Sequence, residues 1–167
     1  MDTIINKVAE SKLEVFDLED LYPTGKRISL DISQWLTEGF LLKEKEFRKS
    51  LSDHDWEVYK DAYVAVYCST DAIIPAWANI LVTVHLTPYA KLIINGSIED
   101  IDAVLYQNIL NQVDYSAYVG KSVILKGCSR KPVPMSAYLL AAQNLQRVAK
   151  SIMYGEACSA VPLYKKR

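Results

Sequence analysis

The sequence predicts an α/β fold in a single domain, residues 1–167, with an internally duplicated strand–Cys-loop–helix–strand unit. We expect a mainly parallel sheet, to which an N-terminal β-hairpin and short helices are added. The first observation is a repeat: the 22 residues from Pro75 and the 22 from Pro134 share eight identities without a gap, against about one or two expected from composition. The second is that strand-length apolar runs alternate with helix-length segments, which indicates parallel strands and right-handed crossovers.

Residues 1–53 are predicted to form the hairpin and the short helices. Residues 13–17 and 26–32 have the composition of short strands, and the turn sequence YPTG between them favours antiparallel pairing. Residues 43–51 predict a charged helix, because Phe47 and Leu51 are four residues apart and share one face.

The first repeat covers residues 54–97. Residues 63–67 are a short run of valine, alanine and tyrosine, which is typical of a buried strand. Proline at position 75 suits the first turn of a helix that ends near Thr87, and residues 91–95 predict a second strand.

A connecting helix, residues 98–112, links this repeat to the second one, residues 113–167. Serine followed by two carboxylates at the start of the helix is a capping signal. The second repeat has the same order as the first: a strand at 122–126, a helix at 134–147 and a strand at 150–154.

Composition excludes several classes of partner. The net charge is −1 and 23% of residues are charged, so no basic field points to nucleic acid or to an anionic membrane surface. No apolar run approaches the length that spans a membrane, and the first residues lack the apolar core of a signal peptide. We therefore expect a cytoplasmic protein that binds neither nucleic acid nor membrane.

Three cysteines, each followed by serine, give the candidate site: Cys68, Cys128 and Cys158. Because parallel strands end at one edge of a sheet, we expect the three thiols on one rim, where helix N-termini favour thiolates. Thiolates bind soft or borderline metals, so the hypothesis is a Zn or Fe ion or an iron–sulfur cluster, with His54 as a further ligand. The polar side chains expected around it are Ser69, Asp71, Ser129, Arg130, Lys131 and Ser159.

Other interpretations of these residues stay open. Each cysteine can be a small buried apolar residue, or a reactive thiol without a metal, since no pair has the C-x-x-C spacing of zinc and redox motifs. A small anion could bind at the helix N-termini, with help from Arg130 and Lys131. His54 can simply be exposed, and His85 falls within a helical pattern, which favours a structural role.

Phrases spread over nearly the whole chain carry a family resemblance: EDLYP, DISQWLTEG, HDW, CSTDAIIPAWA, KGCSRKPVPMSAY and AKSIMYGEACSAVPLYKKR. In these phrases the sequence resembles a small bacterial family, domain of unknown function family 2480, found chiefly in Bacteroidetes. The family has no established activity. The resemblance implies a cytoplasmic protein associated with genes for iron–sulfur cluster assembly, and hence protein partners from that process.

Three classes of function follow from these observations. The first is a non-enzymatic, accessory factor in iron–sulfur or thiol and metal metabolism that uses the three Cys-Ser loops. The alternative is a non-catalytic protein-interaction or small-anion-binding protein in which the cysteines are structural. The third, a thiol-dependent enzyme, lacks an evident base unless His54 reaches the rim.

Overall fold

A computed structural model describes residues 13–126, 130–156 and 158–167. The chain divides into two compact units. Unit 2 is Thr24–Asp102, and unit 1 combines Met1–Pro23 with Ala103–Arg167, so the sequence of unit 2 is inserted into that of unit 1. The single domain of residues 1–167 stays a prediction.

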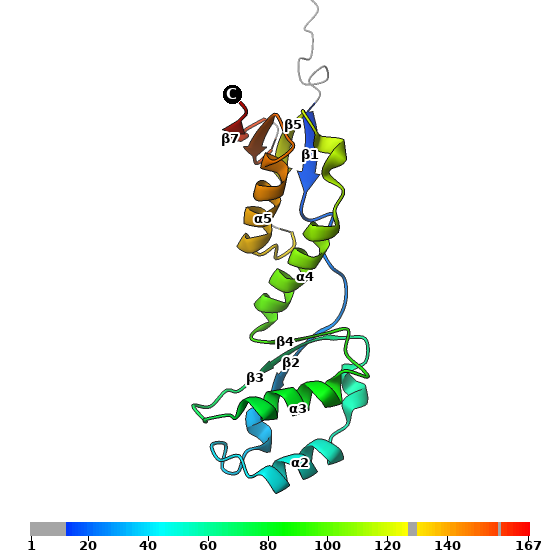
Figure 1. Ribbon diagram of the computed structural model, residues 1–167, viewed down its shortest axis with the longest axis vertical. Coiled ribbons are helices and arrows are strands. Elements are labelled where there is room, and N and C mark those ends of the chain that lie inside the picture. Colours follow the sequence, from blue (N-terminus) through cyan, green and yellow to red (C-terminus); the bar gives the residue numbers. More distant parts are fainter. Residues whose placement is uncertain (1–12, 127–129, 157) are drawn as a thin grey trace, which may run out of the picture. The chain divides into compact units, whose positions relative to one another are not determined.

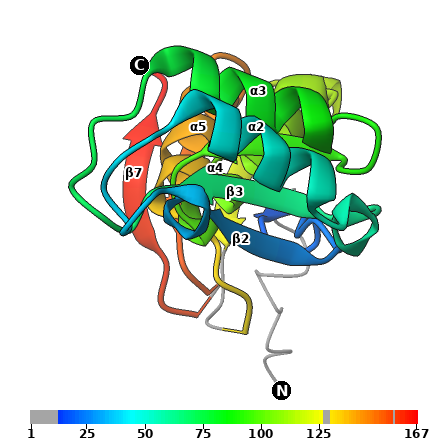
Figure 2. The same cartoon turned by 90° about the horizontal axis from the view of Figure 1, so that it is seen from below.

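Unit 2 is a three-stranded parallel sheet with two helices packed on one face (Figure 2). Its elements are β2 (Arg27–Asp31), η1 (Ile32–Trp35), α2 (Glu44–Asp53), η2 (Trp56–Tyr59), β3 (Tyr63–Tyr67), α3 (Ala76–Leu86) and β4 (Leu92–Asn95). The strand order is β2-β3-β4. Val64 and Val66 alternate along β3 and point to the same face, where they meet Phe47 and Leu51 of α2 and Val82 of α3 in one core.

Unit 1 repeats this arrangement and adds one strand. Its elements are β1 (Leu13–Asp17), most of α4 (Ile98–Gln112), η3 (Tyr115–Tyr118), β5 (Ser122–Lys126), α5 (Met135–Gln146), β6 (Ser151–Tyr154) and β7 (Val161–Lys165). The strand order is β1-β5-β6-β7, with only β7 antiparallel to its neighbour. Helices α4 and α5 lie beside β1 and β5 (Figure 1), and Tyr106 and Leu145 of these helices share a core with Val123.

The two units are copies at a constant spacing of 59 residues, from α2 and the corresponding part of α4 to β4 and β6. Phe47 and Tyr106 are both fully buried, and so are Leu51 and Leu110. Further buried pairs at the same spacing are Val64/Val123, Val66/Leu125, Ala78/Ala137, Val82/Ala141 and Leu86/Leu145. The predicted α/β fold, its parallel strands and its internal duplication are therefore confirmed.

The predicted N-terminal hairpin is wrong. Strands β1 and β2 do not pair: Leu13 of β1 lies opposite Ser122, and Arg27 of β2 lies opposite Tyr63, each in a parallel ladder. Each strand is the first strand of its own copy, because unit 2 begins between them. Asp17 and Asp31, the last residues of the two strands, even accept the same hydrogen bond from a backbone N–H two residues later, at 2.9 Å in both cases.

The strands of the two copies also form two sheets and not one. The expectation that every strand exits at a single shared edge is therefore wrong, because β3 and β5 belong to different sheets.

Helix α4 begins with the predicted cap: the backbone N–H of Ser97 donates to Asp100 Oδ2 at 2.8 Å, and that of Asp100 to Ser97 Oγ at 3.3 Å. Its first turn belongs to unit 2, where Asp102 accepts from Arg27 Nη2 at 2.6 Å. Across the described residues, helices that could span a membrane are not found.

Candidate functional site

The carboxyl edge of the unit 2 sheet holds a small network of polar groups. Asp31 Oδ1 accepts from the backbone N–H of Ser33 at 2.9 Å and of Ser69 at 3.1 Å, and the hydroxyls of Ser33 and Ser69 are 3.0 Å apart. Burial raises the pKa of Asp31, but the hydrogen bonds from Ser69 and Ser33 outweigh it and hold the pKa below its usual 3.8. The network closes a turn, so Ser69 and Asp31 act together as structural groups here.

Cys68 lies next to this network and is half-buried against the unit 2 core. Its Sγ is 3.4 Å from Thr70 Oγ1, which in turn donates to the backbone oxygen of Gly39 at 2.6 Å. The thiol is therefore packed and hydrogen-bonded within its own loop. Asp71, the other acidic residue expected at this site, is exposed.

Cys68 and Cys128 are not in equivalent positions of the repeat. Strands β3 and β5 begin 59 residues apart, at Tyr63 and Ser122, and helices α3 and α5 begin 59 residues apart as well. The loop between strand and helix therefore has the same length in both copies, and Gly127 is the counterpart of Cys68. The match of Cys68 with Cys128 needs a spacing of 60 and is wrong by one residue.

The corresponding edge of unit 1 is a hollow of about 250 Å³ lined by acidic and basic side chains together: Asp17, Glu19, Asp20, Lys126, Arg130 and Lys131. Lys126 Nζ lies 3.8 Å from Asp17 Oδ2 and 3.4 Å from Glu156 Oε1. Glu19 Oε1 accepts from the backbone N–H of Arg130 at 3.0 Å, and Lys131 Nζ donates to the Glu19 carbonyl at 3.1 Å. Carboxylates thus occupy the places that an anion would need, and the hollow gives no support to anion binding.

The remaining residues of the predicted metal site are dispersed. Cys158 is exposed in unit 1, whereas Cys68 belongs to unit 2. The backbone N–H of Ser159 donates to the Glu156 carbonyl at 2.9 Å. Cys128 and Ser129 lie outside the described residues. Within residues 13–126, 130–156 and 158–167, His, Cys, Asp and Glu side chains form no group of three that could hold a metal, so the metal and iron–sulfur hypothesis has no support there.

His54 belongs to an aromatic cluster in unit 2. Its Nε2 is 3.1 Å from the Tyr59 hydroxyl, and its ring centroid is 5.1 Å from that of Trp35 and 4.8 Å from that of Trp56. Burial lowers the pKa of His54 below its usual 6.5, and the nearby charge of Asp55 opposes this shift. His85 stacks on Trp56 at 5.1 Å, in agreement with a structural role.

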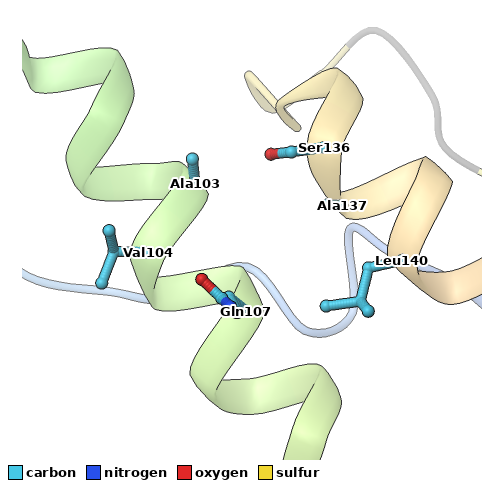
Figure 3. A pocket seen from close by; sticks show the side chains of 6 residues that line it. All are labelled: Ala103, Val104, Gln107, Ser136, Ala137 and Leu140. Atoms are coloured by element: carbon cyan, nitrogen blue, oxygen red, sulfur yellow. The ribbon is translucent and has the colours of Figure 1, made fainter.

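A different site, which the cysteines did not indicate, lies between helices α4 and α5 of unit 1 (Figure 3). The groove has a volume of about 300 Å³ and is lined by Ala103, Val104, Gln107, Ser136, Ala137 and Leu140. Ser136 points from α5 toward α4, and Gln107 lies across the groove from Leu140. Four of the six side chains are apolar, so the groove suits an apolar group with a few polar atoms at its rim.

The internal repeat explains why this groove is open. At a spacing of 59 residues, Ser136 corresponds to Trp77 on α3, and Gln107 corresponds to Arg48 on α2. In unit 2 the Trp77 ring lies 6.0 Å from the Phe47 ring, edge to face, and the Arg48 guanidinium carbon lies 5.4 Å from its centroid. Unit 2 therefore places an indole between its two helices, whereas unit 1 has only a serine hydroxyl in the corresponding position.

The floor of the groove keeps the same pattern in both units. Ala78 and Ala137 are both buried, and Tyr106 replaces Phe47 as the buried ring beneath the helices. The Tyr106 hydroxyl donates to the Leu18 carbonyl at 2.8 Å, which fixes the ring. The aligned repeats already place tryptophan opposite serine at this position, which is the signal from which the groove could have been found.

Comparisons with known proteins give one result. A family model described as "Protein of unknown function (DUF2480)" matches residues 2–166. No curated protein and no solved structure matches the chain.

Proposed function

Because the chain belongs to this family of unknown function, we propose its function from the geometry: it is a non-catalytic protein-interaction protein. Unit 1 receives a side chain of a partner polypeptide in the groove between α4 and α5. Unit 2, which has the same fold, fills the corresponding groove with its own Trp77 and has a structural role.

One observation carries the proposal: of two copies of one fold, one has a closed groove and the other an open one. A Trp-to-Ser difference in a packed interface costs stability unless something else fills the space. The open groove of unit 1 is lined mainly by apolar atoms of Ala103, Val104, Ala137 and Leu140. Its occupation by a partner's side chain would return the contacts that Trp77 makes in unit 2.

The surface beside the groove supports a polypeptide partner. Met135 and Leu139 are one helical turn apart on α5 and are 69% and 58% exposed. They directly precede Ser136 and Leu140 in the sequence, so they extend the apolar surface of the groove along α5. A contiguous apolar surface around a pocket is typical of protein-binding sites, where one anchor residue enters and its neighbours cover the rim.

The test is selection of peptides from a random library on the full-length protein, followed by counter-screening on two variants. Ser136→Trp fills the groove with the side chain that unit 2 uses, and we expect it to abolish binding of the selected peptides. Val119→Trp adds the same side chain at another exposed position of unit 1, where Val119 is 60% exposed, and should leave binding unchanged. Peptides that bind the wild type and Ser136→Trp equally would exclude the groove as the site.

A further inference from the structure

We infer that the side chain that enters the α4–α5 groove is a tryptophan of the partner polypeptide. This inference rests on the proposed function and adds the chemistry of the anchor. The internal repeat supplies the model, because Trp77 of unit 2 shows which side chain this pair of helices accommodates.

The surroundings that hold the Trp77 ring have direct counterparts in unit 1. Phe47, whose ring meets Trp77 edge to face, corresponds to Tyr106, which is fully buried and offers an aromatic ring at the same position of its helix. Edge-to-face pairs add to the stabilisation that comes from burial, and an aliphatic side chain cannot form them. Unit 1 thus keeps the ring of the pair and lacks its partner.

The volume of the groove also favours a large side chain. About 300 Å³ is at the lower limit of pockets that bind organic ligands and exceeds what one methyl-bearing side chain fills. An indole is the largest flat apolar group that a polypeptide can supply, and it leaves the least empty space between two helices.

The rim of the groove meets the one polar requirement of an indole. A buried indole N–H needs an acceptor, and the Gln107 carboxamide and the Ser136 hydroxyl are the polar groups among the lining residues. The corresponding rim in unit 2 is charged, with Arg48 paired to Glu44 at 2.9 Å, whereas unit 1 has Gln107 and Ala103 there. An uncharged rim with a carboxamide suits a neutral donor and gives no ion pair to a charged side chain.

The test is an NMR titration of the full-length protein with N-acetyl-tryptophanamide and, separately, N-acetyl-leucinamide. We expect the tryptophan compound to shift backbone amides of residues 103–107 and 136–140, with a dissociation constant on the order of 1 mM, typical of a single anchor. Leucinamide should bind at least about tenfold more weakly. The shifts should vanish in Ser136→Trp and persist in Val119→Trp.

The outcomes separate this inference from the function on which it rests. Equal binding of the two compounds, shifts outside the groove, or groove-dependent peptides with aliphatic anchors would overturn the tryptophan inference and leave the interaction function intact. Binding of N-acetyl-tryptophanamide to the groove without any groove-dependent peptide would overturn the interaction function and indicate a site for a free indole compound.

Discussion

Replacement of Trp77 by serine converts the closed groove of unit 2 into the open form of unit 1. Trp77 is mostly buried and is the only side chain of α3 that contacts both Phe47 and Arg48 through its ring. A partly buried aromatic side chain removes about 150 Å² from water, equivalent to about 4 kcal/mol at about 25 cal/mol per Å². Residual structure in the unfolded chain reduces this by up to about 40%, and the ring and cation–π contacts each add about 0.5 kcal/mol.

We therefore expect Trp77→Ser to lower the free energy of unfolding of unit 2 by about 3 kcal/mol. For a unit of this size the corresponding fall in Tm is about 12–24 °C. The assay is urea unfolding followed by tryptophan fluorescence, because all three tryptophans of the chain belong to unit 2 and the variant keeps Trp35 and Trp56. The signal thus reports unit 2 alone.

The matched control is Ile80→Ser on the same helix. Ile80 is 63% exposed, so its replacement should change the free energy of unfolding by no more than about 0.5 kcal/mol. A loss below about 1 kcal/mol for Trp77→Ser would refute the reasoning, because the indole would then contribute no more than a surface side chain.

Three further predictions concern other parts of the molecule. Asp102→Asn should lower the stability of unit 2 by about 3 kcal/mol, because it leaves Arg27 without its carboxylate at a mostly buried position, and urea unfolding measures this. The lowered pKa of His54 means that the unfolded chain binds more protons near pH 6.5, so stability should fall as pH drops below 6.5 and through the folded pKa; His54→Gln should flatten this dependence in unfolding curves at different pH values, and an unchanged slope would contradict it. In a Cys128→Ser background the exposed Cys158 should react with a thiol reagent faster than the half-buried Cys68, which mass spectrometry of the labelled peptides can compare; faster labelling of Cys68 would contradict the burial.

The repeat and the α/β class could be predicted because their signals are local. Identities such as Ala78/Ala137 mark buried helix positions, where larger side chains would not fit, and valine-rich runs mark the strands. The pairing of the first two strands could not be predicted in this way. The turn sequence between them favours a hairpin, whereas the actual partner of Leu13 is Ser122, more than 100 residues away in the chain.

The candidate site was misplaced for a related reason. Two Cys–Ser pairs attract an alignment at a spacing of 60, although every flanking element has a spacing of 59. A shift of one residue separates Cys68 from Cys128 in the repeat, and the presence of two sheets removes the shared rim. The groove could not be interpreted from sequence, since its meaning depends on the finding that part of α4 is the counterpart of α2. Only then do Trp77 and Ser136 occupy the same place in two copies of one structure.

The most direct measurement is a crystal structure of the Ser136→Trp variant. If the open groove of unit 1 is the place that Trp77 fills in unit 2, the new indole should lie between α4 and α5, with its ring edge to face on Tyr106 and the groove closed. An indole directed into solvent, or helices α4 and α5 forced apart by it, would contradict the equivalence from which the binding site and its aromatic anchor are inferred.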